Sequence, residues 1–150
     1  MTVDYLAKDP ATDRSVVLMV PSAEAIESPT LLARFYREAR AAGALQHPNI
    51  VAIYDLGVDR GSPYIARELL EGSDLGQIVE REKQEGGQSL ESAVKLLNYV
   101  IPACTALGFA HQNGTIHRDV RPGTIFVCND GRVKLTDFVT PCIARLPTAL

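Results

Sequence analysis

The fold is decided by one stretch of the sequence, His117-Arg118-Asp119-Val120-Arg121-Pro122-Gly123-Thr124-Ile125-Phe126. It sets an acidic residue between arginines and ends on an apolar run. A second apolar run follows Asn129-Asp130-Gly131, and the Asp-Gly step supplies the positive φ that a tight hairpin turn requires. The stretch therefore predicts a polar loop leading into a short β-hairpin, with another acidic residue, Asp137, just beyond it.

Upstream of this stretch the chain begins with short apolar runs and then becomes helical. Strands are predicted around residues 5–7, 16–20, 50–54 and 64–66. A helix is expected to begin after Ser28-Pro29, a typical cap and first position, and to end near Gly43. A longer amphipathic helix is expected from Leu90 to about His111, with Pro102 disturbing its straightness. The sequence thus predicts a strand-rich part followed by a mainly helical part.

Composition excludes several classes of protein. A chain of 150 residues that is 46% hydrophobic and 22% charged is long enough for one packed domain and too apolar for intrinsic disorder. The net charge of −3 is too small to indicate binding to nucleic acid or to an anionic membrane surface. We therefore expect neither partner.

Cysteine usage and the N-terminus indicate a cytoplasmic protein. The three cysteines are an odd number without a Cys-x-x-Cys pair, which favours neither a disulfide framework nor a zinc site. The first residues lack the basic and apolar regions of a signal peptide. The longest mainly apolar stretch, 96–110, is shorter than the ~18–20 residues of a membrane span. No membrane segment is expected.

The stretch at 117–126, with Asp137-Phe138 after it, resembles the catalytic loop and metal-binding motif of protein kinases, where H-R-D-x-K-P-x-N precedes D-F-G. Three upstream segments fall in the family's order. Residues 35–39 resemble the helix with the ion-pairing Glu, residues 47–51 the loop that follows it, and residues 63–72 the strand and hinge between the lobes. The resemblance covers essentially the whole chain and is closest to the bacterial serine/threonine branch.

This resemblance implies an α+β, protein-kinase-like fold of two lobes, truncated at both ends. Residues 1–70 would form the smaller lobe, a reduced antiparallel sheet with one helix, from its second strand to the hinge. Residues 71–150 would form part of the helical lobe, up to the Asp-Phe-Val motif. Met1 aligns inside the glycine-rich loop, and the chain ends before the activation segment. We therefore expect a partial kinase domain.

The resemblance also implies ATP and Mg²⁺ as cofactors and assigns roles to individual residues. Asp119 would orient or deprotonate the acceptor hydroxyl, Arg121 would contact phosphate, and Asp137 would bind magnesium. Thr124 stands at the position of the ligand to a second metal ion. The positions implied to contact the nucleotide are Glu38, Glu68, Leu70, Thr124 and Phe126.

Five residues depart from the family pattern. Met19 replaces the strand lysine that pairs with Glu38, so nucleotide would lose a charge-assisted contact of about 1.5–3 kcal/mol. Thr124 replaces the catalytic-loop Asn, and Val139 replaces the Gly of D-F-G. Arg67 and Asp4 stand at the base-binding site, where the family has apolar side chains. We therefore expect impaired catalysis.

Several alternatives remain open. Asp119 and Asp137 could be ordinary surface acids, and Glu38 could be an i,i+4 partner of neighbouring arginines on a solvated face. The chain could be a serine/threonine kinase acting on a protein substrate, a non-catalytic pseudokinase that binds a protein partner, or an inactive truncated fragment. We also expect the long helix to expose an apolar patch around Leu97 and Ile101, with Cys104 beside them, through which the chain could self-associate.

Overall fold

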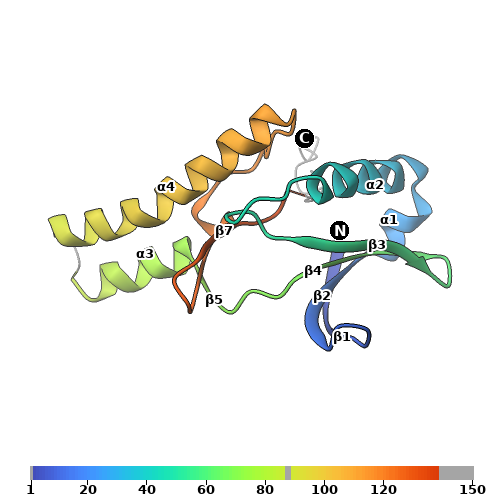
Figure 1. Cartoon of the computed structure of the whole chain (residues 1–150), viewed down its shortest axis with the longest axis horizontal. Coiled ribbons are helices and arrows are strands. Elements are labelled where there is room, and N and C mark those ends of the chain that lie inside the picture. The colour runs from blue at the N-terminus through green and yellow to red at the C-terminus, as the bar shows by residue number, and fades with distance from the viewer. Residues whose placement is uncertain (1, 87–88, 139–150) are drawn as a thin grey trace, which may run out of the picture. The chain divides into compact units, whose positions relative to one another are not determined.

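The structure is a computed structural model of the chain, and it describes residues 2–86 and 89–138 (Figure 1). The described residues form two compact units. The first contains residues 2–44, 52–69 and 138, and the second contains residues 45–51 and 70–137.

The first unit is built on a four-stranded antiparallel sheet in the order β1-β2-β4-β3. Its elements are β1 (Thr2–Asp9), β2 (Arg14–Pro21), α1 (Ala23–Glu27), α2 (Pro29–Gly43), β3 (Ile53–Asp59) and β4 (Ser62–Glu68). Arg60 and Gly61 both have positive φ (48° and 83°), as a two-residue hairpin turn requires. The most deeply buried large side chains of this unit include Phe35 and Ile65, which are 2% and 0% exposed.

The second unit combines a three-stranded antiparallel sheet with helices. Its elements are β5 (Gly72–Asp74), α3 (Leu75–Gln84), α4 (Leu90–Gln112), the 3-10 turn η1 (Pro122–Thr124), β6 (Ile125–Cys128) and β7 (Val133–Leu135). The strand order is β5-β6-β7. Residues 45–51 join this unit because Leu135 bonds to them on both sides. Its N–H donates to the Asn49 carbonyl (2.8 Å), and its carbonyl accepts from the Val51 N–H (3.0 Å).

Most predicted elements are confirmed, and one is wrong. The two hairpins, the helix capped by Ser28 and the long helix through Pro102 are all present. The apolar run at 50–54 is not one strand, because β3 begins only at Ile53. Ile50 and Val51, 2% and 6% exposed, are instead buried in the second unit. The helices α1 and α3 and the strand β5 were not predicted from the sequence.

The long helix α4 buries small residues and exposes large ones. Its buried residues are Ala103, Ala106 and Ala110. Leu90, Val94, Leu97 and Ile101 are 50–81% exposed, and Cys104 is exposed as well. The expected apolar patch is therefore present on this helix.

By length and composition alone, α4 could also cross a membrane. The expectation that no apolar stretch is long enough was therefore wrong: the helix has 23 residues, and 17% of its most apolar window is buried. One such helix among the described residues is weak evidence for a membrane segment, since the core helices of globular proteins pass the same test.

Candidate active site

His117 fixes the start of the predicted catalytic loop. The imidazole is 5% exposed, and its Nε2 lies 2.6 Å from the carbonyl oxygen of Thr136. Its Nδ1 accepts a hydrogen bond from the backbone N–H of Asp119 (3.3 Å). These two bonds assign the ring proton to Nε2 and leave Nδ1 as the acceptor. His117 is thus a core residue, as expected, that ties the loop to the segment after β7.

Asp119 and Arg121 form the accessible, charged part of this loop. The Arg121 Nε donates to the Asp119 Oδ2 at 3.1 Å, and both side chains are about half exposed (56% and 47%). Arg118, between His117 and Asp119, has a φ of 69°, which a non-glycine residue seldom adopts. The loop therefore holds a carboxylate within reach of solvent, in contact with a guanidinium.

Thr124 closes the loop from inside. Its side chain is fully buried, and its hydroxyl accepts from the Arg121 N–H (3.2 Å) and lies 2.9 Å from the Arg121 carbonyl, to which it donates. The Asp119 carbonyl is a second, longer acceptor at 3.3 Å. A hydroxyl has one proton, and here Thr124 donates it to the loop backbone while its oxygen accepts from the Arg121 N–H. The geometry favours a structural role for Thr124 over metal ligation.

Asp137 reaches the same region from the other end of the β6–β7 hairpin. The residue before it, Thr136, donates its N–H to the Thr124 carbonyl (2.9 Å). Asp137 is partly exposed and has a φ of 64°, again rare for a non-glycine residue. The fold thus joins the Asp119 loop to the Asp137 segment through backbone bonds, and residues held in such conformations are frequent at functional sites.

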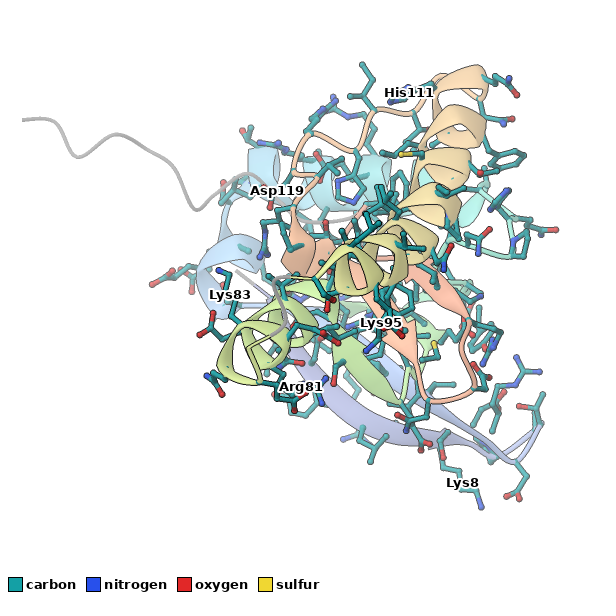
Figure 2. All side chains as sticks on the ribbon, turned by 90° about the vertical axis from the view of Figure 1, so that its left-hand side faces the viewer. Lys8, Arg81, Lys83, Lys95, His111 and Asp119 are labelled. Carbon is teal, nitrogen blue, oxygen red and sulfur yellow. The ribbon has the colours of Figure 1, made fainter. Side chains whose placement is uncertain are left out.

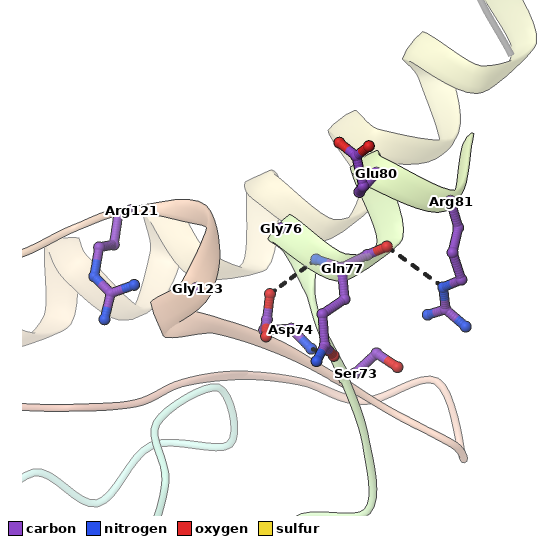
Figure 3. Close-up of a pocket in the computed structure, with 8 residues that line it drawn as sticks. All are labelled: Ser73, Asp74, Gly76, Gln77, Glu80, Arg81, Arg121 and Gly123. Carbon is purple, nitrogen blue, oxygen red and sulfur yellow. Dashed lines mark hydrogen bonds between the residues drawn. The ribbon is translucent and has the colours of Figure 1, made fainter. Parts of the chain in front are cut away.

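A cavity of about 780 Å³ lies next to Arg121 (Figure 3). It is lined by Ser73, Asp74, Gly76, Gln77, Glu80, Arg81, Arg121 and Gly123. Asp74 shapes one side, because its carboxylate accepts from the Gln77 N–H (2.9 Å) and caps α3 in a capping box. A Cβ added at Gly123 would lie 2.5 Å from the Arg121 Nη1, so the glycine leaves room for that guanidinium. The sequence analysis did not predict this cavity.

Ion pairing also connects the two helices of the second unit. Lys95 of α4 pairs with Glu82 of α3, and Figure 2 shows Lys95 beside that helix. The hydrogen bond from the ammonium lowers the pKa of Glu82 below its ordinary value and raises the pKa of Lys95. The pair is partly exposed to solvent, which limits its contribution to stability.

In the first unit, Glu38 has a partner that the family pattern does not supply. Its Oε1 accepts from the Arg34 Nε at 2.8 Å, one helical turn away on α2. The predicted i,i+4 pairing is confirmed, but the predicted solvated face is wrong, since the Glu38 side chain is only 11% exposed. Met19, at the position of the family's lysine, is 7% exposed and carries no charge.

Two charged residues, Asp4 and Arg67, stand at the predicted base-binding site in place of the family's apolar side chains, and they bond to each other. The Arg67 Nη2 lies 2.8 Å from the Asp4 Oδ2. Both residues were identified from the sequence, but their pairing was not predicted. The antiparallel register of β1, β2 and β4 contained the signal, because it brings the two side chains to one face of the sheet.

The remaining predicted site residues are divided between the units. Glu68, 9% exposed, closes the end of β4, where its carboxylate accepts from the Ala52 N–H (3.2 Å). Leu70, Thr124 and Phe126 belong to the second unit, with Asp119, Arg121 and Asp137, whereas Glu38 and Glu68 belong to the first. Val139 lies outside the described residues.

Comparison with known proteins agrees with this geometry. A sequence profile of the protein kinase domain matches residues 2–145. The serine/threonine-protein kinase PknB of Mycobacterium leprae is 40% identical over 142 residues, which are 92% of this chain and 22% of that protein. PrkC of Bacillus subtilis is 35% identical over 134 residues, 89% of this chain and 20% of that protein. The chain thus spans about a fifth of the length of these curated relatives.

Solved structures resemble the chain in the same way. The crystal structure of the Mycobacterium tuberculosis PknI kinase domain is 30% identical with a TM-score of 0.75, and the match covers 94% of this chain and 56% of that one. The predicted α+β, kinase-like fold is therefore confirmed, as is the resemblance to bacterial serine/threonine kinases. With a matching profile over residues 2–145, this chain belongs to the protein kinase family.

Proposed function

We propose that this chain is a serine/threonine protein kinase-type domain in which ATP-dependent phosphoryl transfer to protein is impaired. One observation carries the proposal: the family's strand lysine is replaced by the buried, uncharged Met19, and Glu38, its expected partner, is occupied by Arg34. Phosphoryl transfer depends on cations placed around the phosphates. Losing one removes a contact of about 1.5–3 kcal/mol.

The catalytic loop retains the groups for the acceptor side of the reaction. We assign Asp119 to orienting the acceptor hydroxyl and accepting its proton, because this carboxylate is accessible and is positioned by Arg121 at 3.1 Å. Arg121 would in addition supply positive charge near the transferred phosphoryl group. Contact with phosphate would compete with the pairing to Asp119, since both use the same Arg121 guanidinium.

This arrangement offers one protein ligand for magnesium. Among residues 2–86 and 89–138, no cluster of three His, Cys, Asp or Glu side chains could hold a metal ion alone. Mg²⁺ at nucleotide sites is commonly held by one or two carboxylates together with phosphates and water. We propose Asp137 as that carboxylate, and the bound ion would neutralise charge on the phosphates. The buried Thr124 hydroxyl is a poor candidate for a second site.

A titration with nucleotide tests the proposal. Mg·ATP added to the chain at micromolar concentration is expected to leave its thermal unfolding temperature unchanged, since only a ligand that binds the folded state stabilises it. Transfer of phosphate to a generic protein substrate is expected to stay at the level of the Asp119→Asn variant. Saturable stabilisation, or transfer that Asp119→Asn abolishes, would contradict the proposed impairment.

A second candidate is a non-catalytic module that binds a protein partner, and the exposed side chains of α4 favour it. Leu97 and Ile101 are 55% and 61% exposed on a helix whose buried side is alanine. We propose protein as the class of partner in either case, and the cytoplasm as the compartment. A chain that binds no nucleotide but buries α4 against a second protein would favour the module over the enzyme.

A further inference from the structure

Asp4 and Arg67 lie among apolar residues on one face of the first unit's sheet. Directly opposed residues in an antiparallel sheet point to the same side, and residues two apart along a strand do as well. Asp4 lies opposite Met19, and Met19 lies opposite Ile65. Arg67 lies opposite Val17, two residues along β2 from Met19. These five neighbouring positions therefore combine three apolar side chains with one acid and one base.

The ion pair crosses the middle of this face. Arg67 extends from β4 and Asp4 from β1, and β2 lies between these strands. With strands spaced about 4.8 Å apart, the contact spans roughly 10 Å and passes over β2 near Val17. The two polar atoms nevertheless meet at 2.8 Å. The Arg67 side chain is 19% exposed, and its Nε is buried without a hydrogen-bond partner among the described residues.

This arrangement opposes the binding of a flat apolar ring. A purine gains binding energy by stacking on apolar side chains, whereas here it would strip water from a carboxylate and a guanidinium without offering a charge to either. Removing only one of the two residues would be no better, because the other would then be an unpaired charge beneath the ring. The two residues therefore act as one element.

We propose that the Asp4–Arg67 ion pair is a specificity-determining element that keeps purine bases off this face of the sheet. The inference rests on the proposed function only in taking this face as the place where a nucleotide base would lie. It adds that the two charges must be lost together before a base can bind. Two independent departures from the family pattern would instead contribute separately.

Adenosine is the probe that isolates this effect. It carries the base without phosphates, so its binding does not depend on a phosphate contact at position 19 or on magnesium. The variants are Asp4→Val, Arg67→Met, their combination, and the charge swap Asp4→Arg with Arg67→Asp. The control is Lys8→Met with Asp13→Asn, which removes the 2.6 Å ion pair at the tip of the same β1–β2 hairpin, where the side chains are 62% and 84% exposed. Affinity is measured by calorimetric titration of each folded chain.

We expect only the neutral double variant to gain affinity, by at least about tenfold over wild type, because it alone leaves no charge to be desolvated. Both single variants, the swap and the control should bind adenosine as weakly as wild type. The inference is overturned if the folded double variant binds no better than wild type. It is equally overturned if Arg67→Met alone, or the swap, binds as well as the double variant.

Two provisions keep this test decisive. Far-UV circular dichroism and a cooperative thermal transition establish that each variant is folded. If Asp4→Val with Arg67→Met does not fold, Asp4→Asn with Arg67→Gln replaces it, because these substitutions change side-chain size least. The proposed function is judged separately, on wild-type Mg·ATP binding and phosphate transfer. A wild-type chain that transfers phosphate would refute the impairment, whereas the adenosine comparison alone decides the role of the ion pair.

Discussion

Replacing Thr124 with valine tests whether its hydroxyl holds the catalytic loop together. Valine has nearly the same shape, so the fully buried side chain keeps its packing and loses only the oxygen. The Arg121 N–H then loses its acceptor at 3.2 Å, whereas the Arg121 carbonyl keeps the N–H of residue 124 as a donor at 2.9 Å. One unsatisfied backbone donor costs about 1–3 kcal/mol, so we expect a loss of about 2 kcal/mol in the free energy of unfolding.

Serine at position 124 is the matched control. It keeps the hydroxyl and removes one buried methyl group, which costs about 1 kcal/mol. If the hydroxyl bonds dominate, Thr124→Val is less stable than Thr124→Ser. If apolar burial dominates, Thr124→Ser is the less stable variant. Asparagine, the family's residue, should also destabilise, by about 1–3 kcal/mol, because its amide is larger than the buried site.

Urea unfolding followed by circular dichroism measures these differences, and amide hydrogen exchange provides a local measurement. The Arg121 N–H should exchange faster in Thr124→Val and remain protected in Thr124→Ser. A valine variant within about 0.5 kcal/mol of wild type, or less affected than the serine variant, would show that the bonds to the loop backbone contribute little.

Three further predictions concern other parts of the chain. Met19→Lys should not restore phosphate transfer in a kinase assay, because Glu38 is already engaged and parts that act as a unit are not additive; measurable transfer would contradict this. Glu82→Gln should destabilise the chain at neutral pH in urea titrations, and the difference should shrink as the pH falls below 4.5. The pKa of Glu82 is lowered, so its contribution is present above the ordinary value of 4.5 and is lost as acid protonates the folded state. Leu97→Lys with Ile101→Lys should weaken concentration-dependent self-association in sedimentation, and a wild-type chain that is monomeric at every concentration would refute the argument from their exposure.

The elements set by local signals could be predicted from the sequence. The turn at Asn129-Asp130-Gly131 and the cap at Ser28 act on residues a few positions away, so their hairpin and helix follow directly. The helix α3 carried such a signal as well, in the spacing of Asp74 and Gln77 that forms a capping box, and the sequence analysis overlooked it. The apolar run at 50–51 was wrongly predicted as part of a strand, because nothing local indicates that its partner is residue 135.

The candidate site shows the same division. Its residue types were readable because the catalytic-loop pattern is contiguous, and the i,i+4 spacing indicated a neighbouring arginine as a partner of Glu38. The pairing of Arg67 with Asp4 was not readable, because it depends on strand register and on a side chain that extends across β2. Spacing along the chain does not specify it.

The bond between the Asn49 side chain and the Val133 carbonyl joins residues 84 positions apart, and this separation constrains the order of assembly. During synthesis the β1–β2 hairpin and α2, whose partners are local in sequence, are complete well before β7 is made. Residues 45–51, however, must wait in an unpaired state until the last strand of the second unit has been made. Closing so long a loop is slow, because the entropy lost on closure precedes any gain from contacts. Throughout that interval, Ile50 and Val51 are exposed to chaperones and to neighbouring chains.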